Sequence, residues 1–235
     1  MSEKKKIKVA FPHMGTIYVV WATALKRLGV EPYVPPYTNK KTPSLGTKHS
    51  PESICLPYKL ILGNFIEAIE GGADYVAMIS SPGICRLGEY GNSIQNVLKD
   101  LGYDAKYVEL QLYDGFKGMY KFMSEISGCK NPILVIKSIA SAIKKVFSLD
   151  RLENLLAYYA AREITPGEAE KAFNKGVKLI YDANNSKELK KAEKEATALI
   201  KKVEIDPKRD VVYVDLTGEI YLRSEEHTSE LQSRP

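Results

Sequence analysis

Residues 7–29, which read IKVAFPHMGTIYVVWATALKRLG, contain the pattern that decides the fold. The first five residues form a short apolar run typical of a strand, and a Pro-His-Met-Gly turn follows at 12–15. Apolar side chains then recur at helical spacing as far as Leu28, and Gly29 ends the predicted helix, as glycine often does. A strand, a turn and a helix in this order are typical of a βαβ unit.

The same alternation continues to about residue 112. Further strands are predicted at 33–35, 75–79 and 107–112, further helices at about 57–70 and 93–101, and a loop at 36–50. Strands that alternate with helices imply parallel pairing through right-handed crossovers. We therefore predict an α/β fold with a Rossmann-like, doubly wound parallel sheet.

From about Pro132 the pattern becomes helical. Two helices are predicted at 133–147 and 149–161. A third helix follows a capping box at 165–168, and a fourth runs from Ser186, its predicted cap, to about 203. One strand follows at 211–216. A lone strand cannot form a sheet, so we expect the first strand of a truncated second α/β lobe. The predicted divisions are a Rossmann-like lobe at 1–128, a helical connector at 129–205 and the start of the second lobe at 206–222.

The segment at 223–235 resembles a translated sequencing adapter. It has no apolar period, and it interrupts a strand-to-helix transition at Leu222. We expect this segment to be an artefact outside the fold, and the chain to be the front portion of a longer protein.

Composition excludes several classes of protein. The 235 residues carry 34 basic and 29 acidic side chains, and the lysines are scattered over helical segments, which indicates a solvated surface and no nucleic-acid partner. No apolar run reaches the roughly 20 residues of a membrane helix, and no signal core precedes the first strand. We expect a cytoplasmic protein with no membrane partner, whose 3 cysteines form no disulfide framework.

Two of these cysteines fall where a parallel sheet binds ligands. Ligands bind beyond the carboxyl ends of the strands, where helix N-termini also point. Cys55 lies at the entry to a predicted helix, Cys85 directly follows a strand, and the turn containing His13 follows the first strand. A positive helix end favours the thiolate, which is the form that binds metal.

The surroundings of Cys85 suit an inorganic cluster. Small residues such as Gly83 let the backbone approach a bulky group and donate N–H hydrogen bonds to sulfide. Zinc fits less well, because there is no CxxC pair and no neighbouring histidine. Free cysteines are also common as small buried hydrophobes, so the residues alone leave both interpretations of Cys55 and Cys85 open.

The other candidates have weaker signals. His13 either caps its turn or acts as a proton donor over the site. Arg86 could pair with a phosphate or carboxylate, and Cys129 is expected to be structural. No P-loop pattern occurs, so we do not expect the chain to be an ATPase, and the sequence assigns no catalytic residue.

Three segments, at 12–15, 52–59 and 85–91, resemble the 2-hydroxyacyl-CoA dehydratase family, which includes the D component of 2-hydroxyglutaryl-CoA dehydratase. The most similar branch is known as CoA-enzyme activase-related or CoA protein activase. The resemblance spans roughly 7–222. It implies a [4Fe-4S] cluster held by three cysteines between Rossmann-like lobes, with Cys55 and Cys85 as the first two ligands and the third beyond Leu222.

The resemblance also implies a function. It predicts low-potential electron transfer, or radical dehydration of an acyl-CoA, with an ATP-dependent activator protein as partner. An enzyme of this kind would be a dehydratase-like lyase or a component of an ATP-driven reductase. We expect His13, Gly83 and Arg86 to contact the cofactor. The alternative is a non-catalytic α/β protein that carries a cluster, or that binds a small molecule and has structural cysteines.

Overall fold

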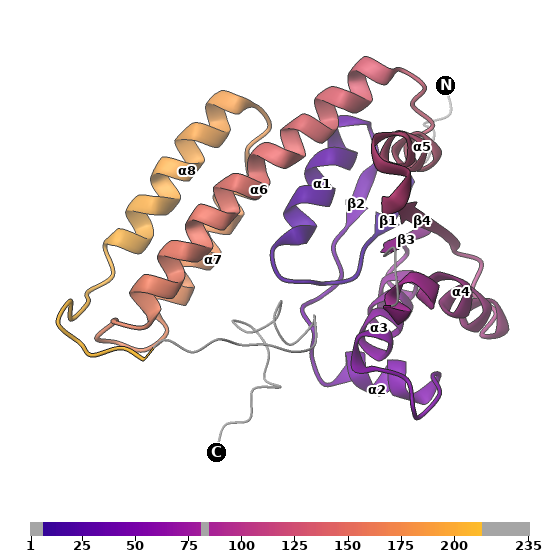
Figure 1. Cartoon of the computed structure of the whole chain (residues 1–235), viewed down its shortest axis with the longest axis horizontal. Helices are drawn as coiled ribbons and strands as arrows, with labels where there is room; N and C mark the ends of the chain where they lie inside the picture. Colours follow the sequence, from indigo (N-terminus) through magenta and orange to yellow (C-terminus); the bar gives the residue numbers. More distant parts are fainter. Residues whose placement is uncertain (1–6, 81–84, 213–235) are drawn as a thin grey trace. The chain divides into compact units, whose positions relative to one another are not determined.

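The computed structural model describes residues 7–80 and 85–212. The chain divides into two compact units, one up to Ser138 and the other from Ile139. Figure 1 traces both units along the chain.

The first unit contains a four-stranded parallel sheet, which confirms the predicted fold class. Its strands are β1 (Lys8–Ala10), β2 (Glu31–Tyr33), β3 (Tyr75–Ser80) and β4 (Lys106–Gln111), in the order β2-β1-β3-β4. Ala10 pairs with Tyr33 on one side and with Val76 on the other, so β1 is central. The chain leaves β1 toward β2 but later adds β3 on the opposite side, as a doubly wound sheet requires.

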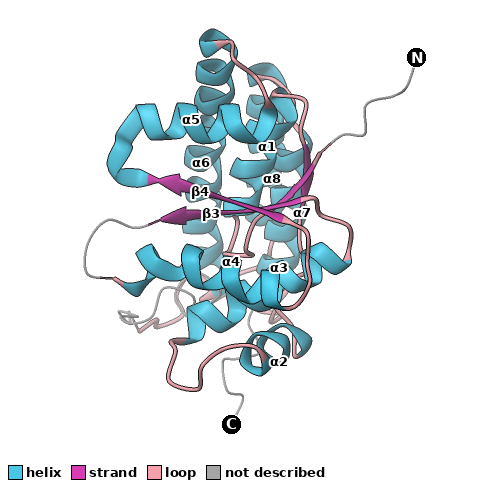
Figure 2. Cartoon of the chain, turned by 90° about the vertical axis from the view of Figure 1, so that its right-hand side faces the viewer, coloured by secondary structure: helices cyan, strands magenta, loops and turns pink. Residues whose placement is uncertain are grey.

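Helices cover both faces of this sheet (Figure 2). One layer contains α1 (Ile17–Arg27) and α5 (Gly115–Ser127), which meet where Trp21 packs edge-on against Phe122 at 5.7 Å between ring centroids. The other contains α3 (Leu56–Glu70) and α4 (Tyr90–Asp100), after the short 3-10 helix η1 (Arg86–Glu89). The main core lies under the second layer and is largely made of Tyr58, Leu60, Ile61, Leu62, Phe65, Ile66 and Ile94, all at most 1% exposed.

The segment predicted as a loop contains a further helix, α2 (Lys41–Lys48). It packs against α3 backbone to backbone: a Cβ on Gly46 would lie 1.7 Å from the carbonyl oxygen of Lys59, and one on Gly63 would lie 2.1 Å from that of Thr42. α2 packs through a glycine against backbone and not through a stripe of apolar side chains. Its sequence therefore has no helical period from which the helix could be predicted.

The helical part of the chain contains α6 (Pro132–Ala160), α7 (Glu168–Asp182) and α8 (Ser186–Lys201). The sequence analysis predicted two helices at 133–147 and 149–161. The structure has one continuous helix, α6, across both ranges, because no glycine or proline interrupts it. In the second unit α7 and α8 pack closely at Gly176: a Cβ added there would lie only 2.9 Å from the Cβ of Ala196.

Both predicted helix caps of this part are wrong. At the start of α7, Gly167 has a φ of 85°, and the Glu163 carboxylate accepts hydrogen bonds from the N–H groups of Gly167 and Ala169. At the start of α8, the Asn185 side chain accepts two backbone hydrogen bonds, while Ser186 is already the first helical residue. In each case a neighbouring side chain with better reach takes the capping role.

The predicted strand at 211–216, the start of a second lobe and the segment at 223–235 lie wholly or mostly outside the described residues. Among the helices that the structure describes, none is long and apolar enough to cross a membrane.

Candidate functional site

The carboxyl edge of the sheet gathers the segments that the sequence singled out. The chain diverges here between the adjacent strands β1 and β3, and ligands of doubly wound sheets bind at such a switch point. The turn containing His13 follows β1, and Cys85 follows β3 after four residues that are not described. Gly83 is one of those four, so its predicted role lies outside the described residues.

Cys55 occupies the N-cap position of α3. Its backbone is extended (φ −64°, ψ 151°), and its side chain makes no capping hydrogen bond. The partly buried Sγ lies instead within hydrogen-bond distance of the Tyr90 hydroxyl. Both the helix end and this hydroxyl can stabilise negative charge on the sulfur.

Tyr58 and Tyr90 join the two cysteine motifs. The two rings meet edge to face with centroids 5.2 Å apart, and both are almost wholly buried. The Tyr58 hydroxyl shares a hydrogen bond of 2.8 Å with Ser93 on α4. Burial raises the pKa of Tyr58 and outweighs the opposing effect of Ser93. The motif around Cys55 and the motif after Cys85 therefore pack as one unit.

Cys85 is the N-cap of η1 and is exposed. Its backbone is extended, and its side chain makes no capping hydrogen bond either. Arg86, the first residue of η1, is also exposed, which leaves its guanidinium accessible to an anion. Ser80, at the end of β3, donates a hydrogen bond to the carbonyl of Gly88 and so ties η1 to the sheet.

His13 is buried rather than open to the edge, with 1% of its surface exposed. Its backbone N–H donates to Asn64 Oδ1 on α3 at 2.8 Å. Its ring packs between Tyr37 and Tyr18, with centroid distances of 4.5 and 5.3 Å. These contacts place the imidazole inside an aromatic cluster beside the switch point.

The sequence analysis missed Glu109, a partly buried carboxylate on β4. It accepts hydrogen bonds from the Tyr107 hydroxyl at 3.1 Å and from Gln111 Nε2 at 2.6 Å. Burial raises the pKa of Glu109, and nearby Glu89 adds to this effect, while the two hydrogen bonds oppose it. The polar residues at every second position of β4 were the available signal, because they mark one face of the strand.

Gly91 makes room for this carboxylate. A Cβ at that position would lie 2.5 Å from Glu109 Oε1 and 2.7 Å from the Tyr107 hydroxyl. The glycine of the second cysteine motif thus has a packing role against β4.

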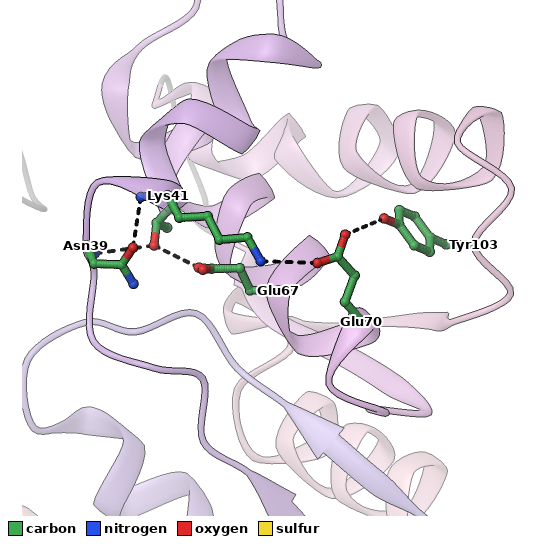
Figure 3. A network of polar contacts seen from close by, with 6 residues as sticks. Asn39, Lys41, Glu67, Glu70 and Tyr103 are labelled. Carbon is green, nitrogen blue, oxygen red and sulfur yellow. Dashed lines mark hydrogen bonds and ion pairs between the residues drawn. The ribbon is translucent and has the colours of Figure 1, made fainter.

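A polar network fixes α3 from its outer side (Figure 3). The Thr42 hydroxyl donates to buried Glu67 at 2.7 Å, and Lys41 pairs with Glu70 at 3.3 Å. The Tyr103 hydroxyl donates to the same Glu70 at 3.2 Å. The contacts of Thr42 and Lys41 hold α3, and with it Cys55 at its N-terminus, against α2, while Tyr103 ties the end of α3 to the segment after α4.

Within residues 7–80 and 85–212, no group of three or more histidine, cysteine, aspartate and glutamate side chains is arranged to hold a metal ion. Cys129 lies beyond the end of α5, where Gly128 adopts a left-handed conformation, and its thiol lies 3.9 Å from the carbonyl oxygen of Asn131.

Comparison with known proteins gives one family. A family model described as "CoA enzyme activase uncharacterised domain (DUF2229)" matches residues 10–230. No curated protein matches the chain. The description agrees with the CoA-activase-related branch that the motifs resemble and places the chain in the context of CoA enzyme activation. The likeness to the dehydratase D component and the adapter origin of 223–235 stay predictions. Because the match covers most of the sequence, the chain belongs to the CoA enzyme activase uncharacterised domain family.

Proposed function

We propose that the chain is an iron–sulfur component of a CoA-linked enzyme system and holds a [4Fe-4S] cluster through Cys55 and Cys85. One observation carries this proposal: the two cysteine motifs pack on each other through Tyr58 and Tyr90 at the carboxyl edge of the sheet. Both cysteines are N-cap residues whose side chains are not used for capping. In this proposal the third thiolate comes from beyond Leu222.

The chemistry of these residues fits such a cofactor. Iron–sulfur clusters are held by thiolates and tuned by hydrogen bonds to their sulfur atoms. The start of α3 presents backbone N–H groups at Cys55, and the Tyr90 hydroxyl is placed to donate to its sulfur. When bound, the cluster would supply one-electron chemistry at low potential: it would receive an electron from an ATP-dependent activator and pass it to an acyl-CoA.

Other residues of the chain would bind the substrate or the partner protein and hold the surroundings of the cluster in place. Exposed Arg86 next to Cys85 is suited to pair with a phosphate of CoA or a carboxylate of the partner protein. His13, enclosed by Tyr18 and Tyr37, would hold the turn after β1 in place beside the cluster. We place this chemistry in the cytoplasm, where thiols stay reduced.

Anaerobic reconstitution tests the proposal. The natural full-length protein is incubated with ferrous iron and sulfide and desalted, and its iron content and thiolate-to-iron absorbance are measured. We expect Cys55→Ala and Cys85→Ala each to abolish most of the bound iron. Cys129→Ala is the matched control, because Cys129 lies beyond the end of α5, outside both cysteine motifs. A wild-type protein that retains no iron, or equal retention in all variants, contradicts the proposal.

A second candidate is a small-molecule-binding α/β protein with structural cysteines. The partial burial of Cys55 favours this alternative, since free cysteines are often small buried hydrophobes. It predicts that Cys55→Ala lowers stability without changing iron content. If iron is bound, turnover of an acyl-CoA with an added activator separates a catalytic component from a carrier.

A further inference from the structure

Asn64 is a polar residue in the middle of the buried face of α3. Its surface is 0% exposed, and its neighbours Leu60, Ile61 and Phe65 are equally buried. Its Oδ1 accepts the hydrogen bond from the His13 N–H at 2.8 Å. Since only the oxygen of a side-chain amide can accept, this contact fixes the orientation of the group.

The other end of the amide has no acceptor. Asn64 Nδ2 is buried and makes no hydrogen bond with any residue in the described part of the chain. A buried donor without an acceptor is destabilising, and the few that folded proteins contain often have a functional reason. The hydrogen bond from the His13 N–H accounts for the Oδ1 end of this side chain, but it leaves the Nδ2 end without an acceptor.

A second donor lies on a segment that touches the same turn. Thr38 Oγ1 is also buried and lacks a partner among the described residues. It follows Tyr37, whose ring packs on His13 at 4.5 Å. The two donors thus come from α3 and from the segment after β2, and both elements contact His13 at the carboxyl end of β1. This is the side of the switch point where ligands of such sheets bind.

The surroundings select a neutral acceptor over an anion. An anion among these apolar side chains would lose its hydration. Glu67, one turn further along the same helix, adds a carboxylate with 8% of its residue surface exposed, which would repel a second negative charge. A carbonyl oxygen accepts the same hydrogen bonds without a net charge.

We propose that Asn64 Nδ2, assisted by Thr38 Oγ1, binds the carbonyl oxygen of an acyl thioester. The choice of a thioester rests on the proposed function, which places the chain in a CoA-linked system. The site itself rests on the two donors, and its test does not require iron.

The test compares two probes that differ at one group. Acetyl-CoA has the thioester carbonyl, whereas S-ethyl-CoA has a methylene in its place. Their affinities for the wild-type chain, Asn64→Asp, Thr38→Val and Asn154→Asp are measured by calorimetry. At a pH high enough to ionise the new carboxyl group, Asn64→Asp keeps the acceptor for the His13 N–H but has no donor. Asn154→Asp is the matched control, because this exposed amide lies on α6 and donates to the carbonyl of Asp150 in the same helix.

We expect Asn64→Asp to weaken the binding of acetyl-CoA about tenfold or more, and Thr38→Val to weaken it a few-fold, because each variant removes a hydrogen bond to the carbonyl oxygen. Binding of S-ethyl-CoA should be the same in all four chains. If Asn64→Asp does not fold, Thr38→Val still has to separate the two probes. Equal losses for both probes, or no binding of acetyl-CoA by the wild-type chain, overturn the inference. Iron content decides the cluster proposal separately.

Discussion

The hydroxyl of Tyr90 lies within hydrogen-bond distance of the sulfur of Cys55, although the two residues are 35 positions apart in the sequence. The contact joins the start of α3 to the start of α4 and connects the two cysteine motifs chemically as well as by packing.

Tyr90→Phe tests this contact. The variant removes the side-chain partner of the Cys55 sulfur, so we expect the alkylation rate of Cys55 to change several-fold and the free energy of unfolding to fall by about 1 kcal/mol. Iodoacetamide labelling followed by peptide mass spectrometry measures the rate, with Cys129 in the same sample as internal control. A Cys55 rate that does not change relative to Cys129 would show that the hydroxyl has no influence on the thiol.

Gly91→Ala tests the close packing of α4 on β4. The added Cβ would come within 2.7 Å of both Glu109 Oε1 and the Tyr107 hydroxyl, so we expect a loss of about 1–3 kcal/mol. Urea denaturation measures this loss. Asn92→Ala, at the next and exposed position of the helix, should stay within about 0.5 kcal/mol of wild type. Similar values for the two variants would contradict the packing role of Gly91.

Glu109 should give stability a characteristic pH dependence. Burial raises its pKa in the folded state above the ordinary 4.5, with Glu89 contributing, so the folded state binds a proton more tightly than the unfolded state. This contribution is fully present below the ordinary value and is lost as the pH rises through the raised value. The free energy of unfolding of Glu109→Gln relative to wild type should therefore increase as the pH rises above the ordinary value of 4.5. Denaturation series at several pH values measure it, and a constant difference contradicts the raised pKa.

Asn185→Ala and Ser186→Ala separate two candidate caps of α8. Asn185 accepts backbone hydrogen bonds from Lys187 and Glu188 at 3.0 Å, so its replacement should cost about 1 kcal/mol. Ser186 accepts a hydrogen bond from the exposed Lys144, and its replacement should have little effect on stability. Thermal denaturation compares the two, and the reverse order would restore Ser186 as the cap.

The sheet could be predicted because its strands carry their own signal. The runs at 7–11 and 75–79 are apolar, short and bounded by turns, and the helices between them have a clear period. By contrast, α2 could not be predicted, since it is stabilised by the close approach of Gly46 to the α3 backbone, a contact that no local pattern records.

The site was predictable only in part, for the same reason. Parallel topology alone placed Cys55 and Cys85 at the carboxyl edge of the sheet. The contact of Cys55 with Tyr90 and the buried Nδ2 of Asn64 depend on how the helices pack, which no local sequence pattern indicates. A single asparagine within an otherwise apolar helix face was nevertheless a visible signal.

The glycine contacts between α2 and α3 also limit how this protein can vary. Neither Gly46 nor Gly63 leaves space for one additional carbon, because the opposing atoms belong to the backbone and cannot rotate away. In a saturation library selected for folding, these two positions should therefore tolerate almost no replacement, while exposed positions of α2 such as Ser44 accept many. The position of the Cys55 sulfur therefore depends on α2, a helix that contains no candidate ligand or catalytic residue.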